Sequence, residues 1–321
     1  MPAPTAASRS ALVTGAAGFV GTRLVRALGA AGWRVTATAQ QADTSREADG
    51  DVRWLAGDVR DLAHLRAAVD AARPDAVFHL AAVSFVPAAA ADPGFTVEVN
   101  AVAASRLVGV LAEGRRGGEL DPVVVVVGSS EQYGRHDAAE FPLIEHAELR
   151  PHNVYAASKV AQEALALQAW RSAGLRVVAA RPFNHSGAGQ NGRFLLPGLV
   201  ARTRALRGAP PGTPLVMGNQ DTVRDFLHVE DVVAAYIALA ERGRPGEAYN
   251  VASGVGHSTG DLARRVLARA GVDAPVEVDP ALVRPAEVPE LVGSAAKLRA
   301  DTGWAPRRTL DDAIDELLHD S

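Results

Sequence analysis

The sequence predicts an α/β fold with a doubly wound parallel sheet and a smaller C-terminal domain that would bind the substrate. Apolar, strand-like runs alternate with amphipathic helical stretches from the start of the chain. Five consecutive valines at 123–127 form a β-branched run without polar alternation, which indicates a strand buried on both faces. After Arg181 the alternation stops, and residues 183–224 hold four prolines and seven glycines. Strands separated by helices over this length imply a parallel sheet.

The elements follow in order along the chain. Strands are expected at 11–14, 34–39, 76–82, 122–127, 175–180 and 249–251. Helices are expected at 19–30, 62–72, 96–113, 155–173, 195–206 and 229–241, with two more begun by Ser258 and Thr309. Each of these two residues has an aspartate three positions later, as helix capping requires. We expect residues 1–182 plus about 225–253 to form the sheet domain, and about 183–224 plus 254–321 to form the smaller one.

Composition excludes several classes of function. A net charge of −4 argues against non-specific binding to nucleic acid or to an anionic membrane. The chain has no cysteine, so disulfides, thiolate metal sites and cysteine nucleophiles are excluded. The nine histidines show no metal-ligand spacing, and no metal is expected. The first ten residues have no apolar core, and no apolar run approaches the roughly 20 residues of a membrane span, so we expect a cytoplasmic protein.

The first chemical signal is TGAAGFVG at residues 14–21, between the first strand and the first helix. Gly15 would permit a tight turn, Gly18 would let the backbone approach a pyrophosphate, and Gly21 would let helix and strand pack closely. The helix N-terminus would supply donors for the phosphate charge. Three glycines can also be plain turn chemistry, but their place after the first strand favours a dinucleotide-binding Rossmann domain.

The end of the second strand usually selects between NAD and NADP. An acidic residue there holds the ribose hydroxyls of NAD, and an arginine accommodates the extra phosphate of NADP. Residues 38–41 read Thr-Ala-Gln-Gln and offer neither, so both cofactors stay possible. Asp58 stands where an adenine contact would be expected, and the alternative is that it caps the helix that follows.

The second signal is Tyr155 and Lys159. Positions four apart lie on one face of a helix, so the two side chains would point the same way. A nearby ammonium stabilises a tyrosinate, so we expect Lys159 to lower the pKa of Tyr155. Such a pair is weak in isolation, but Ser129 directly follows the valine strand, where parallel-sheet enzymes place functional groups. Its hydroxyl could bind a substrate oxygen while Tyr155 moves the proton.

TGAAGFVG, Gly57–Val59, HLAA at 79–82, Ser129 and YAASK at 155–159 occur in the order seen in extended short-chain dehydrogenases/reductases, the NAD-dependent epimerase/dehydratase family. The resemblance covers nearly the whole chain. It implies that Ser129, Tyr155 and Lys159 are catalytic and that Asn100 supports the loop at 81–83. It also implies a set of residues that bind the cofactor: Gly15, Gly18, Phe19, Val20, Asp58, Val59, Leu80, Ala81 and Ala82, together with Tyr155 and Lys159.

Later segments resemble enzymes acting on GDP-mannose derivatives. RPFNHSGAGQ at 181–190 is similar to their RPFNHxGPGQ stretch, with Ala188 in place of proline, and GNQDTVRDF at 218–226 and RPAEVP at 284–289 also match. The similarity is nearest to GDP-4-keto-6-deoxymannose reductases, followed by GDP-mannose 4,6-dehydratases. The resemblance implies substrate-binding residues: Ser84, Ser130, Asn184, Arg224, Arg284 and Glu287. Surface ion pairs, Arg224 with Asp225 or Asp221 and Arg284 with Glu287, are the alternative for the two arginines.

Glu131 leaves the reaction open. It matches the glutamate with which dehydratases remove the proton at sugar carbon 5, but related reductases can also carry it. The favoured hypothesis is NAD(P)H-dependent reduction of a 4-keto-6-deoxy sugar linked to a nucleoside diphosphate. The alternatives are a redox-neutral dehydratase or epimerase, and a non-catalytic dinucleotide sensor, against which the intact trio argues. The family also implies a homodimer formed through helices 96–113 and 155–173.

Overall fold

A seven-stranded sheet dominates the structure, a computed structural model that describes residues 8–41, 52–283 and 288–320. Its strand order is β10-β6-β5-β4-β1-β2-β3, and all the pairings are parallel. The order reverses direction between β1 and β4, so the predicted doubly wound sheet is confirmed. The strands are β1 (Ser10–Thr14), β2 (Arg34–Ala39), β3 (Val52–Ala56), β4 (Ala76–His79), β5 (Val123–Val127), β6 (Arg176–Pro182) and β10 (Ala248–Val251).

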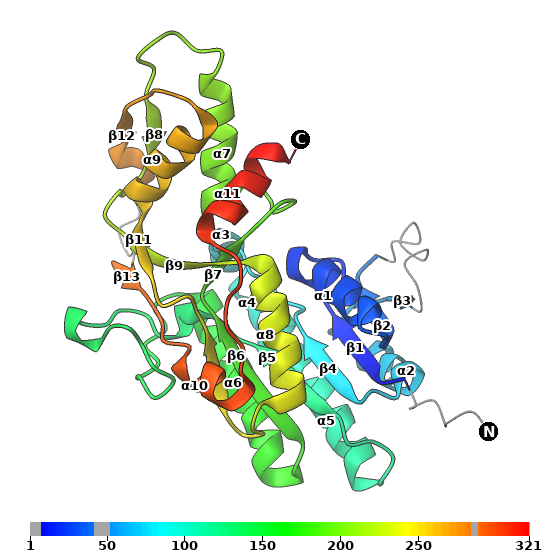
Figure 1. Cartoon of the computed structure of the whole chain (residues 1–321). Coiled ribbons are helices and arrows are strands. Elements are labelled where there is room, and N and C mark those ends of the chain that lie inside the picture. Colours follow the sequence, from blue (N-terminus) through cyan, green and yellow to red (C-terminus); the bar gives the residue numbers. More distant parts are fainter. Residues whose placement is uncertain (1–7, 42–51, 284–287, 321) are drawn as a thin grey trace.

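Helices cover both faces of this sheet (Figure 1). One face packs on α1 (Phe19–Ala30), α8 (Val229–Arg242) and α10 (Ala296–Thr302). The other packs on α2 (Leu62–Ala72), α5 (Ala103–Arg116) and α6 (Val154–Ala173). The valine strand shows why both layers are needed: Val125 joins the first core, whereas Val124 and Val126 join the second. Alternate side chains of a strand point to opposite faces, so an all-valine strand needs apolar cover on each.

A smaller group of elements forms a third core. β9 (Val223–His228) pairs with β11 (Gly256–Ser258), β13 (Glu290–Leu291) and β7 (Asn184–Ser186), and β8 (Leu215–Met217) pairs with β12 (Val276–Val278). With these strands pack α7 (Leu195–Leu206), α9 (Thr259–Ala270) and α11 (Leu310–His319), which lie together at the top of Figure 1. The domain boundary predicted near residue 225 falls inside β9, and the exact division into domains stays a prediction.

The sequence located the long elements better than the short ones. Helices α1, α2 and α7 agree with the prediction at both ends, and Ser258 and Thr309 accept the predicted capping hydrogen bonds from the backbones of Asp261 and Asp312. The predicted strand 76–82 is wrong at its end, since β4 stops at His79. Strands β3, β7–β9 and β11–β13 were not predicted, because two to six residues at an edge or in a small sheet show little periodicity.

The predicted helix 96–113 is part of a longer helical segment. α3 (Val86–Ala91) and α4 (Pro93–Val97) precede a π-turn at Glu98–Val102 that runs into α5. By length and composition alone, the helical segment Pro93–Arg116 is long and apolar enough to cross a membrane. Its most apolar 18-residue window has a mean hydropathy of 1.4. The expectation that no apolar run approaches that length is therefore wrong, yet 61% of the window is buried inside the protein, as in a core helix.

Candidate active site

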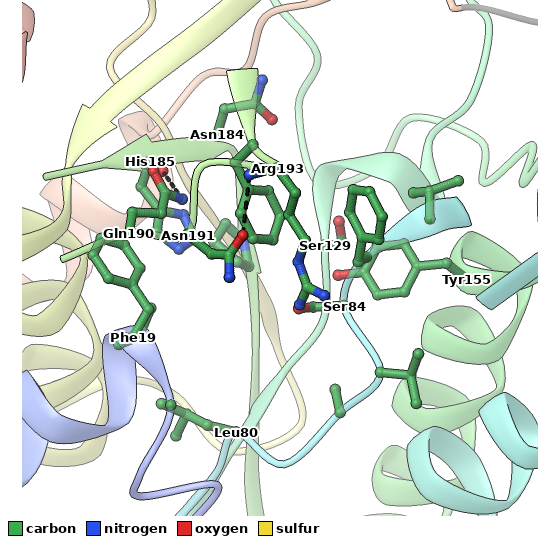
Figure 2. Close-up of a pocket in the computed structure, with 18 of the residues that line it drawn as sticks. Phe19, Leu80, Ser84, Ser129, Tyr155, Asn184, His185, Gln190, Asn191 and Arg193 are labelled. Atoms are coloured by element: carbon green, nitrogen blue, oxygen red, sulfur yellow. Dashed lines mark hydrogen bonds between the residues drawn. The ribbon is translucent and has the colours of Figure 1, made fainter. Parts of the chain in front are cut away.

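A cavity of about 1730 Å³ runs between the seven-stranded sheet and the smaller group of elements. It is larger than the roughly 300–1,000 Å³ of a site for one small ligand, so it could hold two. The glycine-rich turn lines one part of it, Ser129 and Tyr155 another, and the loop before α7 a third. Figure 2 shows that Phe19 and Leu80 approach from the side of the glycine-rich turn, and Asn184 and Arg193 from the opposite wall.

The glycine-rich turn fits a pyrophosphate. Gly15 has a φ of +68°, and a Cβ there would lie 2.7 Å from the backbone nitrogen of Ala81. A Cβ on Gly21 would lie 2.2 Å from the carbonyl oxygen of Gly15, so the close packing requires glycine at both positions. α1 begins after Gly18 with no side chain capping it, which leaves its first N–H groups available for an anion. Phe19 and Val20 also line the cavity.

The predicted adenine end is lined by Gln40, Gly57 and Val59, but Asp58 is not among the lining residues. Its carboxylate accepts from the Arg60 backbone nitrogen at 2.8 Å and from Arg60 Nη2 at 2.7 Å. These bonds hold the pKa of Asp58 below its usual value. The alternative role of Asp58 as a helix cap is wrong, because Asp61 caps α2. Its contact with adenine stays a prediction.

Three predicted catalytic side chains lie around one part of the cavity, at the carboxyl end of β5. Ser129 follows β5, and Tyr155 and Lys159 lie on the first two turns of α6, whose cap is Asn153. All three line the cavity and are buried. Figure 2 shows the oxygens of Ser129 and Tyr155 facing the same part of the cavity. The arrangement can present a hydroxyl pair to one substrate oxygen.

The electrostatics of this trio differ from the expectation. Burial raises the pKa of Tyr155 to about 12; the nearby Ser129 hydroxyl acts against this rise, and the charge of Glu131 adds to it. Burial also lowers the pKa of Lys159 to about 7. Lys159 Nζ donates to the carbonyl oxygen of Val127 at 2.7 Å and to Gln162 Oε1 at 2.8 Å. The expectation that Lys159 lowers the pKa of Tyr155 is wrong here, and Tyr155 is a protonated phenol at neutral pH.

The loop after β4 is fixed by one buried amide. Asn100 Oδ1 accepts from the Val83 backbone nitrogen at 2.8 Å, and its Nδ2 donates to the Val83 carbonyl at 3.2 Å and to Ser158 Oγ at 2.8 Å. The predicted supporting contact of Asn100 is therefore present. The loop that it holds presents Leu80, Ala81, Ala82 and Ser84 to the cavity.

Glu131 lies in the cavity wall beside the trio. It is part of a 3₁₀ turn at Ser130–Gln132, and both Ser130 and Glu131 line the cavity. Asn153 Nδ2 donates to Glu131 Oε2 at 3.2 Å, and His152 Nε2 lies 3.7 Å from the same oxygen. A carboxylate that is held by Asn153, lies near His152 and lines the cavity could act as a base towards a bound sugar.

The predicted substrate-binding residues divide into two sets. Ser84, Ser130, Asn184 and Arg224 line the cavity, and Arg224 Nη1 donates to the carbonyl of Val223 at 2.9 Å. Arg284 and Glu287 lie outside the described residues. Within the described ranges, no cluster of three or more histidines and acids could hold a metal ion.

Sequence reasoning missed several residues of this site. The guanidinium of Arg193 lies 4.7 Å from the ring centroid of Phe85, beside Ser84, and Figure 2 shows the side chain reaching into the cavity. No residue spacing signals that contact. Gln162 and Glu163, by contrast, lie three and four positions after Lys159, and helical spacing places them on the face of α6 that carries Tyr155 and Lys159.

A model of the family described as GDP-mannose 4,6 dehydratase matches residues 12–317. The chain belongs to this family. The resemblance to extended short-chain dehydrogenases/reductases of GDP-mannose derivatives is thus confirmed. The chain is also 37% identical over 250 residues to GDP-6-deoxy-D-mannose reductase of Pseudomonas aeruginosa, across 77% of this chain and 80% of that protein.

Two solved structures are similar over nearly the whole chain. RMD from Pseudomonas aeruginosa, complexed with NADPH, has a TM-score of 0.81 and 31% identity, and the match covers 97% of this chain and 98% of that one. UDP-glucose 4-epimerase from Thermus thermophilus, complexed with NAD, has a TM-score of 0.82 and 31% identity over 96% and 97% of the two chains. Relatives with either cofactor thus share this fold.

Proposed function

We propose that the protein reduces a 4-keto-6-deoxy sugar linked to a nucleoside diphosphate, GDP in the first instance, with NADPH or NADH. The single observation that carries the proposal is the buried Tyr155, a phenol that keeps its proton at neutral pH, beside Ser129 in a cavity shared with the glycine-rich turn. A reductase needs a proton donor at this position. The similarity to a GDP-6-deoxy-D-mannose reductase supports the same substrate class.

The chain's own groups account for the proton half of the reaction. A reduced nicotinamide cofactor, with its pyrophosphate at the glycine-rich turn, would supply the hydride for carbon 4. Tyr155 gives its phenolic proton to the oxygen of carbon 4, and the Ser129 hydroxyl holds that oxygen by a hydrogen bond. Because the pKa of Tyr155 is about 12, the phenol keeps its proton until charge develops on the substrate. Lys159, whose Nζ donates to the Val127 carbonyl and to Gln162 Oε1, would bind the cofactor ribose.

The second candidate is a redox-neutral dehydratase or epimerase, and Glu131 favours it. A dehydratase must remove the proton at carbon 5 and expel the hydroxyl at carbon 6, so it needs a carboxylate base. Its first step, however, oxidises carbon 4 and requires Tyr155 to be present as the tyrosinate, a form that a pKa of about 12 makes scarce at neutral pH. A sensor without catalysis would have no use for the trio.

The deciding experiment supplies a GDP-linked 4-keto-6-deoxy sugar with NADPH or NADH. We expect the absorbance of the reduced nicotinamide to fall one-for-one with substrate, and a 6-deoxy sugar as product. Conversion of GDP-mannose without added reductant would establish the dehydratase instead. The ratio of kcat/KM values with NADPH and NADH would determine the cofactor preference.

We also propose a homodimer in the cytoplasm and the division into domains stated above. Apolar side chains on the helices predicted to pair support the dimer: Val97 is 42% exposed, Val102 38% and Leu165 37%. Burying them against a second copy would remove them from water. A monomeric mass by light scattering at micromolar concentration would contradict the dimer.

A further inference from the structure

A chain of buried polar side chains runs behind Ser129, on the side away from the cavity. Gln132 Oε1 accepts from the Ser129 backbone nitrogen at 2.7 Å, and Gln132 Nε2 donates to Glu163 Oε2 at 3.0 Å. Glu163 also accepts from Arg181, at 2.9 Å from Nε and 2.5 Å from Nη2. Gln132 is fully buried, and Glu163 and Arg181 are each only 5% exposed. None of the three lines the cavity.

The chemistry of the chain fixes which way the amide of Gln132 points. A carboxylate only accepts hydrogen bonds, so Glu163 forces the NH₂ group of Gln132 towards itself and the oxygen towards Ser129. Arg181 neutralises Glu163 with a two-pronged contact, which lets the carboxylate stay ionised although buried. Arg181 Nη1 in turn donates to Tyr133 Oη at 2.9 Å. Each of these buried side chains thus has hydrogen-bond partners that allow it only one orientation.

The peptide before Ser129 is held from the other side. Lys159 Nζ and Gln162 Nε2 donate to the Val127 carbonyl at 2.7 and 3.3 Å, and the Gly128 nitrogen donates to the Ala180 carbonyl at 2.7 Å. A Cβ on Gly128 would lie 2.2 Å from Gln132 Oε1, so only glycine leaves the amide this close. The backbone that carries the Ser129 hydroxyl is therefore fixed on both sides.

We infer that Gln132, Glu163 and Arg181 are positioning residues, which act through Ser129 and set the orientation of its hydroxyl towards Tyr155 and the substrate oxygen. The inference rests on the proposed function for its effect on turnover. The expected effect is on kcat and not on the affinity for substrate or cofactor, because the three side chains do not reach the cavity. A displacement of about 1 Å in a reacting group can cost roughly 10²-fold in rate.

Gln132→Met keeps the side-chain length and removes both hydrogen bonds, and Glu163→Gln keeps the shape and frees the amide to rotate. We expect Gln132→Met to lower kcat by roughly 10- to 100-fold, and Glu163→Gln by less. The KM for the sugar and the cofactor affinity should stay within about threefold, since uniform binding is unaffected. Unchanged cofactor binding also shows that each variant is folded.

The matched control is Asp231→Asn. Asp231 is another buried acid, 4% exposed, that accepts from the backbone nitrogens of Arg307 and Arg308 at 2.9 Å and lies outside the cavity lining. It should lower the melting temperature and leave kcat unchanged at 25 °C. If Asp231→Asn and Gln132→Met lower kcat equally at equal loss of stability, the role is structural and the inference fails.

A double-mutant cycle tests whether the effect passes through Ser129. In a Ser129→Ala background, Gln132→Met should lower kcat further by less than about threefold, because the hydroxyl that Gln132 orients is absent. If the reductions in kcat caused by the two single substitutions multiply in the double variant, the inference fails.

Amide hydrogen exchange of the segment 128–133 gives a readout independent of turnover. Gln132→Met should speed the exchange of this segment, and Asp231→Asn should not; equal exchange in both would overturn the inference. A wild-type protein that reduces no 4-keto sugar would count against the proposed function, while the exchange result still decides the positioning.

Discussion

Lys159 should make the stability of the protein depend on pH. Its pKa is about 7 in the fold, whereas an exposed lysine titrates near 10.5. Between these values the unfolded chain binds more protons than the folded one, so the free energy of unfolding rises with pH. This contribution is fully present above pH 10.5 and is lost as the pH falls to 7. From pH 7 to 9.5 it amounts to about 3 kcal/mol, which is about 4 °C in melting temperature for a chain of 321 residues.

The assay is thermal unfolding of the cofactor-free protein and of Lys159→Met, between pH 7 and 9.5. Other groups titrate alike in both, so the difference between the two slopes isolates Lys159. Tyr155, with its pKa raised to about 12, contributes the opposite slope only above pH 10 and stays outside the window. We expect Lys159→Met to gain about 4 °C less than the wild type over this range. Parallel curves would refute the reasoning, because they would mean that burial does not perturb the ammonium.

Three further outcomes follow from the site. Tyr155→Phe should lower turnover by roughly 10²- to 10⁴-fold with cofactor affinity nearly intact; near wild-type rates would remove Tyr155 from the trio. Glu131→Gln should keep 4-keto reduction within about tenfold of wild type, a barrier change near 1.4 kcal/mol, and a larger loss measured by nicotinamide absorbance would make Glu131 essential. Gly15→Ala should weaken cofactor binding, measured by titration, because its Cβ would meet the Ala81 backbone at 2.7 Å. Gly32→Ala is the control, since Gly32 also has a positive φ of +78° but no atom within 4 Å of the added Cβ.

The sequence predicted the parts of the site that depend on local spacing. The glycine-rich turn, Ser129 after the valine strand and the Tyr155–Lys159 pair on one helix face are all set by neighbours within a few positions. The structure places them together because parallel strands end at one edge of the sheet. Whether these residues are catalytic stays a prediction that the variants above test.

The sequence could not predict what depends on contacts between distant segments. The pKa of Tyr155 is set by burial, which the expected effect of Lys159 left out. Arg193 meets Phe85 across more than a hundred residues, and Gln132 meets Glu163 across thirty-one. The short strands β7, β8 and β13 exist because a partner strand satisfies their backbone, not because their own residues alternate.

The path of the chain between the cores has a consequence for how the protein could be divided. β7 to β9 belong to the smaller group, α8 and β10 return to the large sheet, and β11 and α9 leave it again. Leu298 and Trp304 then pack in the core of the large sheet before α11 closes the smaller one. No single cut separates the large sheet domain from the smaller group, so neither can be exchanged by joining fragments at one junction. Substitution within the cavity walls is therefore a more direct way to change substrate preference in this architecture than exchange of a whole domain.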